Sequence, residues 1–389
     1  MHLAYTAEQE ALARELRRYY ATLLDPDTRR MLRDDATGTT MRSVVKQMAA
    51  DGWLGVGWPT EWGGQGRGPI EQFIFFDEST RTGAPVPVIG INTVGPALMA
   101  HGTEEQKRRF LPGIVAGETF FCIGYSEPEA GTDLGSLRTT AVRDGDEYVI
   151  TGQKMWTSYI SVGDYCWLAA RTDPTAEKHK GISILIVPLD SPGITVSPLR
   201  LLNDHDIAAV YYDEVRVPVA NLVGGENNGW RVITSQLNHE RVTIGGPGLC
   251  GGLFADVRRW AAETRRPDGR RVIDDEWVRT HLARCYAGLD VLRLMNWRIA
   301  WDATQGRTSV EHVSATKVFG SELYLDVISR LMEVVGERAY LKHDADGAVL
   351  AARLEEAYRY HLILTFGGGA NEVQRELIAG FGLGLPRAR

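Results

Sequence analysis

The sequence of 389 residues predicts an α+β fold with an N-terminal helical domain, a middle antiparallel β-barrel or sandwich and a C-terminal four-helix bundle. Three observations support this prediction. Apolar residues recur at helical spacing at both ends of the chain, short β-branched runs fill its middle, and a hydrophobic content of 44% is sufficient for a sizeable core. We expect the domains to span residues 1–117, 118–228 and 229–389.

The N-terminal region carries two signals for the start of a helix. Thr6 and Gln9 have the spacing of a capping box, in which each side chain bonds the backbone N–H of the other residue. Thr103 and Gln106 repeat this arrangement. Between the two boxes, proline and glycine in the segment 58–64 interrupt any helix, so this segment predicts a loop between packed helices.

Short runs rich in β-branched and aromatic residues predict the strands of the middle domain. They cover residues 120–125, 137–142, 148–151, 165–171, 182–187 and 208–217. Asp144 and Gly145 lie between two of these runs and are typical of a hairpin turn. Several strands at such short spacing indicate an antiparallel barrel or sandwich.

Long helical patterns return after Gly229. They cover residues 230–263, 274–304, 310–335 and 348–365. Segments rich in glycine, proline and aspartate separate them, including Pro267-Asp268-Gly269. Four long helices connected in this way predict a bundle.

Composition and charge exclude several functional classes. A net charge of −7 argues against a nucleic-acid-binding surface. Arginine pairs at 258–259, 265–266 and 270–271 could contact cofactor phosphates or be solvated, and the sequence leaves both readings open. The N-terminus lacks the pattern of a signal peptide, and no apolar run is long enough to span a bilayer, so we expect a cytoplasmic protein without membrane insertion.

The cysteines are widely separated and lack the spacing of a metal site. They are Cys122, Cys166, Cys250 and Cys285. We therefore expect buried thiols, with no disulfide framework and no bound metal.

Local motifs in a fixed order carry a resemblance to a known family. They are Gly-Thr-Glu-Glu-Gln-Lys at 102–107, Tyr-Ser-Glu-Pro-Glu-Ala-Gly-Thr-Asp at 125–133, Gly-Gln-Lys-Met-Trp at 152–156, Val-Arg-Val-Pro at 215–218 and Asn-Glu-Val-Gln-Arg at 371–375. With the order of domains, they make the chain resemble the acyl-CoA dehydrogenases over essentially its whole length. The resemblance implies FAD-dependent oxidation of an acyl-CoA thioester to its α,β-enoyl-CoA, with an electron-transfer flavoprotein-type acceptor.

The resemblance also implies a set of cofactor-binding residues. They are Tyr125, Ser126, Gly131, Thr132, Trp156, Ser158, Ala370 and Glu372. In relatives the segment matching 125–132 lines the flavin, and Thr132 is expected to touch the thioester arm of CoA as well. Trp156 alone would favour a buried core position, but its motif favours a place beside the flavin rings.

The carboxylate that removes the substrate α-proton in most of the family is absent, because Gly368 occupies its position. Some members place this base on the first helix of the C-terminal domain, immediately before a characteristic arginine. Glu240 and Arg241 match that pair. A Glu-Arg pair on a helix is usually solvated or an ion pair, yet the vacant position makes Glu240 the expected base. Arg241, Thr132 and the backbone N–H of Gly368 are the expected substrate contacts.

A second absence concerns the residues that homo-oligomeric relatives lend to a neighbour's flavin site. Asp268 replaces the phenylalanine of an Arg-x-x-Phe-Gly motif, Glu276 lies near a glutamine position, and the later loop at 333–338 carries Glu333. Carboxylates there would oppose a pyrophosphate. The chain thus resembles the base-carrying subunit of bacterial heterotetrameric dehydrogenases of steroid side chains, which implies a homologous partner subunit in an α2β2 assembly.

This closer resemblance implies a bulky substrate, such as a steroid CoA thioester. A cluster of glycines could free space for it, or could kink or end a helix, and both readings stay open. The glycines are Gly245, Gly246, Gly248, Gly251 and Gly252. Three other functions also stay open: dehydrogenation of another branched acyl-CoA, a non-catalytic subunit, and a flavin oxidase or monooxygenase.

Overall fold

The computed structural model describes residues 4–35, 37–202, 207–240, 245–307 and 309–386, with only the backbone described at 237–240. The chain forms two compact units. The first, here called the helical unit, comprises Met1–Leu24, Gly68–Ala84 and Arg241–Arg389. The second, the sheet unit, comprises Asp25–Arg67 and Pro85–Glu240. The predicted domain boundaries, which follow the order of the sequence, stay predictions.

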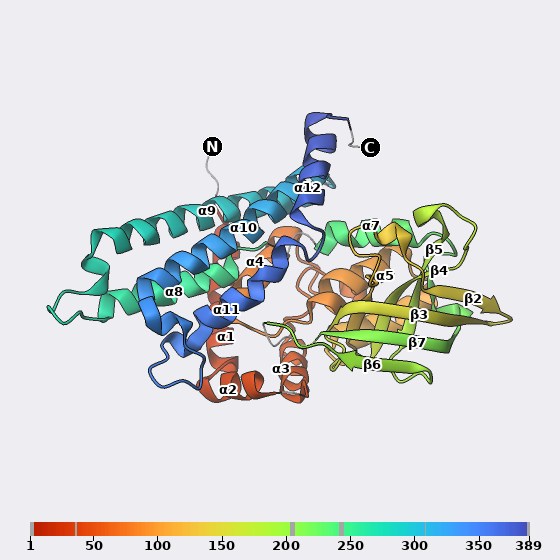
Figure 1. Ribbon diagram of the computed structural model, residues 1–389, viewed down its shortest axis with the longest axis horizontal. Helices are drawn as coiled ribbons and strands as arrows, with labels where there is room; N and C mark the ends of the chain where they lie inside the picture. The colour runs from red at the N-terminus through yellow and green to blue at the C-terminus, as the bar shows by residue number, and fades with distance from the viewer. Residues whose placement is uncertain (1–3, 36, 203–206, 241–244, 308, 387–389) are drawn as a thin grey trace. The chain divides into compact units, whose positions relative to one another are not determined.

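The helical unit is built from α-helices that pack along one another. They are α1 (Ala7–Leu23), α4 (Pro69–Thr82), α8 (Gly248–Glu263), α9 (Glu276–Thr304), α10 (Val310–Val335), α11 (Arg353–His361) and α12 (Asn371–Leu377). α10 packs against α8, α9 and α11, as the predicted bundle requires, and α4 adds contacts to α1, α8 and α9 (Figure 1). The capping box at Thr6 is confirmed at the start of α1.

The predicted helix at 230–263 is wrong as a single element. α7 (Gly229–Glu240) ends before the Gly-Gly-Pro segment, and α8 begins at Gly248. Pro247 lacks a backbone N–H and disfavours the helical conformation for the residue before it, so an uninterrupted helix is unfavourable here. The predicted helix at 348–365 is also shorter, because the α-helix covers only Arg353–His361.

The glycines of α8 permit a close approach to α4. A Cβ atom at Gly248 would lie 2.1 Å from the carbonyl oxygen of Asp77, and one at Gly252 would lie 2.4 Å from that of Arg81. At Gly251 the nearest atom would be Nη1 of Arg81, at 2.6 Å. The structure therefore favours the helix-ending reading of this cluster, with backbone packing in place of free space for a ligand.

Replacing Gly248 by Ala should destabilise the helical unit. The new methyl group would overlap a backbone carbonyl that cannot rotate away, and overpacking of this kind costs about 1–3 kcal/mol. Gly380→Ala is the matched control, since a Cβ atom there has no neighbour within 4 Å. Denaturant unfolding of both variants measures the difference, and equal stabilities would contradict the packing argument.

The sheet unit combines one mixed sheet with five α-helices among the described residues. The helices are α2 (Pro26–Asp34), α3 (Thr39–Ala50), α5 (Gly95–His101), α6 (Glu104–Val115) and α7. The strands are β1 (Phe121–Gly124), β2 (Thr140–Asp144), β3 (Glu147–Ser158), β4 (Tyr165–Arg171), β5 (Ile182–Pro188), β6 (Ile194–Pro198), β7 (Ile207–Pro218) and β8 (Leu222–Val223). The capping box of Thr103 and Gln106 is confirmed at the start of α6.

The strand order is β6-β7-β3-β2-β4-β5-β8, and β1 pairs with β4 outside this path (Figure 1). Most neighbours are antiparallel, as predicted, but β1 and β2 both run parallel to β4. The predicted hairpin is confirmed, because Asp144 pairs with Glu147 around Gly145, whose φ is +62°. β6 and β8 were not predicted.

The core of the sheet unit surrounds the central strands. β4 and β5 are buried along almost their whole length, which is typical of strands covered on both faces. All four cysteines are buried, as predicted. α7 packs against β5, α5 and the π-helical turn η2 (Ile89–Val94). No helix among the described residues is long and apolar enough to cross a membrane.

Candidate active site

A buried ion pair shapes the loop that follows β1, where the flavin contacts are expected. The ammonium of Lys154 lies 2.8 Å from the carboxylate of Glu127 and also donates to the carbonyl of Tyr125 at 3.0 Å. The same carboxylate accepts the backbone N–H groups of Arg138 at 2.7 Å and Thr139 at 2.9 Å. These bonds fix both ends of the loop to β3.

Both members of this pair are charged at neutral pH. Burial lowers the pKa of Lys154 to about 8, against the attraction of Glu127. Burial opposes ionisation of Glu127, but Lys154 and the surrounding donors outweigh it and lower the pKa of the carboxyl. Because removing one partner would leave an unpaired buried charge, the pair enforces one loop conformation.

Trp156 lies on a bulge in β3 and presents its ring to solvent. Register with β7 shifts between Lys154 and Thr157, and Met155 donates its N–H to the carbonyl of Ser126 at 2.8 Å. Trp156 has a φ of +64° and is 53% exposed. A tryptophan at positive φ adopts an unfavourable backbone conformation, and such strain is typical of functional sites. Because the ring is exposed, Trp156 is not a core residue of this chain.

The residues around this bulge fit a flavin. An exposed indole offers an apolar face to a planar aromatic ring. Gly131 and Thr132 are exposed on the loop, and a Cβ atom at Gly131 would meet nothing within 4 Å, so a ligand can approach its backbone. Ser158 ends β3 and is partly buried. The described part of this surface therefore offers an apolar face, open backbone and hydroxyls.

The glycine loop before α12 is held by a buried lysine of the helical unit. Gly368 and Gly369 have φ values of +68° and +98°, which side chains disfavour. Lys317, 1% exposed, donates to the carbonyl of Gly369 at 2.7 Å and to the side-chain oxygen of Asn371 at 2.8 Å. Ser321 also donates to Asn371. The N–H of Gly368 thus belongs to an anchored loop.

The remaining residues expected at this end lie at the start of α12. Ala370 is the N-cap residue, with extended backbone angles, and Glu372 is exposed in the first turn. Gly368 is itself exposed in this chain. Position 368 therefore offers only backbone N–H and C=O groups and no carboxylate.

α7 carries the position of the expected base along its buried stripe. Gly229, Val232, Ile233 and Gln236 are buried, and the spacing of three and four residues places position 240 on the same stripe. The side chain of Glu240 lies outside the described residues, as does the whole of Arg241.

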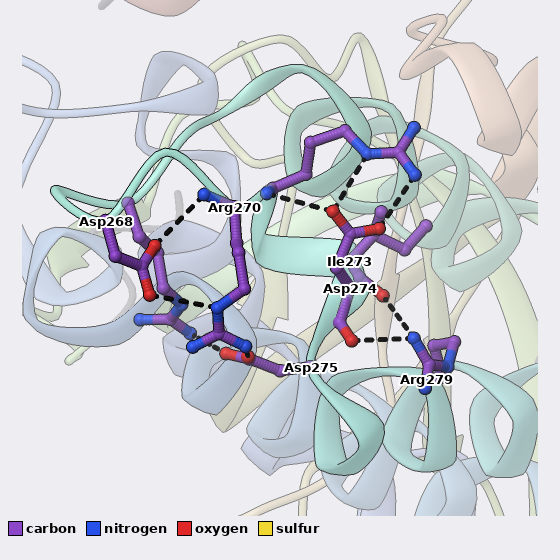
Figure 2. Close-up of polar contacts among 8 residues, drawn as sticks. Asp268, Arg270, Ile273, Asp274, Asp275 and Arg279 are labelled. Atoms are coloured by element: carbon purple, nitrogen blue, oxygen red, sulfur yellow. Dashed lines mark hydrogen bonds and ion pairs between the residues drawn. The ribbon is translucent and has the colours of Figure 1, made fainter.

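The arginine-rich turn before α9 is neutralised by its own aspartates. Figure 2 shows Arg270 bonded to both Asp268 and Asp275, each at 2.9 Å. Arg271 pairs with Asp274 at 2.7 Å, and hydrogen bonds from this guanidinium lower the pKa of Asp274 to about 2. Arg266 also pairs with Asp275, at 2.6 Å. These contacts favour the solvated reading of arginines 266, 270 and 271 over phosphate binding.

Comparison with known proteins settles the family. The acyl-CoA dehydrogenase N-terminal, middle and C-terminal domain models match residues 6–118, 122–215 and 227–383. The chain belongs to the acyl-CoA dehydrogenase family. It is an oxidoreductase that acts on the CH–CH group of an acyl-CoA.

Several relatives cover the whole chain. Acyl-CoA dehydrogenase FadE26 of Mycobacterium tuberculosis is 52% identical over 398 residues, with 100% of both chains covered. A chain of the ChsE4-ChsE5 complex from the same organism has 53% identity, a TM-score of 0.93 and full coverage of both chains. The Tcur3481-Tcur3483 steroid ACAD has 46% identity and the same TM-score and coverage.

Three residues that organise this acyl-CoA dehydrogenase site had no role in the sequence prediction. Glu127 and Lys154 lie inside recognised motifs, but only the structure shows that they pair. Lys317 gave one usable signal, because a lysine four residues after the apolar Val313 interrupts the apolar face of a predicted helix. A lysine on such a face must find partners, and here it finds the glycine loop.

Proposed function

We propose that this chain catalyses the FAD-dependent α,β-dehydrogenation of a steroid side-chain acyl-CoA, with Glu240 as the base that removes the α-proton. The proposal depends on a change in the position of the catalytic carboxylate along the chain. Gly368 offers no side chain where the family usually places its acid, while Glu240 lies on α7 four residues after the buried Gln236. A carboxylate held in an apolar environment is a better proton acceptor than a solvated one.

The reaction balances with one proton and one hydride removed. The proton on the α-carbon passes to the carboxylate of Glu240, and its bonding electrons form the α,β double bond as the β-hydride leaves. FAD, when bound, supplies the hydride acceptor at N5. The N–H of Gly368 donates to the thioester oxygen as negative charge develops there, and Lys317 keeps this donor in place through Gly369.

The sheet unit supplies the remaining contacts of the proposal. The loop of Tyr125, Ser126, Gly131 and Thr132 lines the flavin, and the exposed ring of Trp156 packs beside it. Ser158 would contact the reactive face of the flavin. Ala370 and Glu372 are the further residues proposed to contact the cofactor. Arg241 orients the CoA portion, and an electron-transfer flavoprotein-type acceptor reoxidises the enzyme.

A homologous partner subunit completes the flavin site in this proposal, within an α2β2 heterotetramer. The neutralised turn at 265–275 supports it, because the paired arginines 266, 270 and 271 do not offer free charge to a neighbour's pyrophosphate. Similar chains occur in the ChsE4-ChsE5 complex and in the Tcur3481-Tcur3483 steroid ACAD. The latter supports a steroid-type substrate.

The first experiment measures bound FAD and native mass for the chain alone and with a co-expressed homologous subunit. We expect one FAD per unlike pair and little FAD on the chain alone. The complex should then oxidise a steroid side-chain CoA thioester faster than a linear acyl-CoA. One FAD per protomer in a stable homo-oligomer would contradict the divided site, and equal rates with both thioesters would contradict the steroid assignment.

A further inference from the structure

A buried amide joins the start of the flavin loop to α7. The hydroxyl of Tyr125 and the indole N–H of Trp167 both donate to the side-chain oxygen of Gln236. The indole lies 3.0 Å from this oxygen and 3.1 Å from the Tyr125 hydroxyl. Because an indole N–H can only donate, the amide must present its oxygen to the pair. Gln236 and Trp167 are each 0% exposed.

The amide nitrogen of Gln236 is buried and has no hydrogen-bond partner among the described residues. A buried donor without a partner is destabilising, and an apolar side chain of similar size would avoid that cost. Gln236 is thus a poor choice for stability alone. The side-chain oxygen of Gln236 accepts two hydrogen bonds, and it is the atom that connects α7 to the neighbouring segments.

The place of Gln236 along the helix gives this contact a consequence. Gln236 lies four residues before Glu240, which is one helical turn or about 6 Å along the axis. Tyr125 is the first residue after β1, and its carbonyl accepts a hydrogen bond from the ammonium of Lys154. The last turn of α7 is therefore tied to the loop that carries the expected flavin contacts, within the same compact unit.

We infer that Gln236 is a positioning residue, which uses its hydrogen bonds from Tyr125 and Trp167 to fix the last turn of α7 and with it the backbone position of Glu240, the proposed base. The inference rests on the proposed function of Glu240. A general base must lie within hydrogen-bond reach of the proton that it removes, and a misplacement of about 1 Å can lower a rate by about 100-fold. Hydrogen bonds one helical turn away from the base restrict such a displacement.

Two variants test the inference in the FAD-loaded complex. Gln236→Leu removes the shared acceptor, and Tyr125→Phe removes one donor without changing side-chain shape. Tyr212→Phe is the matched control, because it removes the hydroxyl of a buried tyrosine of the same unit, which donates to Cys166 at 3.4 Å. Trp167 keeps the Tyr125 hydroxyl as an acceptor in Gln236→Leu, so no new unpaired indole is created.

Proton transfer is the deciding readout. A 3-thiaacyl-CoA has sulfur at the β-position and no hydride to lose, so exchange of its α-hydrogens in D2O reports the base separately from oxidation. We expect Gln236→Leu to lower both this exchange and turnover per bound FAD by roughly tenfold or more, with Tyr125→Phe smaller in the same direction. Thermal midpoints are measured in parallel.

Each outcome decides the inference. Exchange at the wild-type rate in both single variants would overturn it, even if their thermal midpoints fall, because a structural role alone moves only stability. A Tyr212→Phe variant that slows exchange equally would overturn it too. If Gln236→Leu fails to fold, Tyr125→Phe decides alone. The Glu240→Gln variant distinguishes failure of the proposed function from failure of the inference. Retained turnover in Glu240→Gln would show that Glu240 is not the base. Lost turnover in Glu240→Gln together with normal exchange in the Gln236 variants would contradict only the positioning role.

Discussion

Replacing Glu240 with Gln should abolish turnover while the complex keeps its FAD. The amide has nearly the same shape as the carboxylate but cannot accept the α-proton, and a general base contributes about 10²–10⁴-fold to a rate. We therefore expect a loss on the order of 10³-fold in kcat, with little change in bound flavin or native mass. Stopped-flow reduction of the flavin by a steroid side-chain CoA thioester measures it directly.

Glu263→Gln is the control for this experiment. Glu263 is an exposed glutamate at the end of α8, so its replacement makes the same change in charge on a different helix. Retained turnover in Glu240→Gln would support the alternative of a non-catalytic subunit whose partner supplies the base. Rapid reoxidation of the reduced wild-type flavin by oxygen would instead favour an oxidase on the same scaffold.

The fold was predictable where one physical signal dominated. The helix at 310–335 was predicted at its observed bounds because apolar residues recur at helical spacing along most of its length. The break between α7 and α8 was not predicted, because the apolar spacing resumes beyond Pro247 and conceals it. β6 (Ile194–Pro198) is mostly exposed at the edge of the sheet, so its side chains lack the alternation that marks a half-buried strand.

The candidate site divides in the same way. Motifs selected Trp156 and Gly368 as candidate residues, and the structure shows both exposed at positive φ. The sequence prediction gave Gln236 and Lys317 no role, although Lys317 interrupts an apolar face, since a polar residue in a helix is usually exposed. Only packing between distant segments shows that each is buried and hydrogen-bonded to a loop residue more than 50 positions away, Tyr125 for Gln236 and Gly369 for Lys317. Long-range contacts of this kind leave no local pattern.

Replacing Lys317 with Met should cost the enzyme most of its activity through the glycine loop. Met retains the long apolar stem but cannot donate, so the carbonyl of Gly369 and the oxygen of Asn371 lose a charged donor inside the helical unit. Two adjacent residues at positive φ then lack their anchor, and the N–H of Gly368 is no longer held in one direction. Losing one preorganised oxyanion donor lowers kcat by about 10²–10³-fold, and we expect a loss of that size.

The control for Lys317→Met is Arg375→Met, which removes a cation paired at 2.6 Å with Glu322 on the exposed surface between α10 and α12. An exposed pair contributes little to stability, so this variant should keep normal kcat. A fall in kcat for Lys317→Met with normal exchange of the 3-thiaacyl-CoA α-hydrogens would contradict the role of the loop, because enolate stabilisation must also affect proton removal. A fall in both, with FAD retained, would show that the loop acts on the thioester oxygen and that Lys317 holds it there.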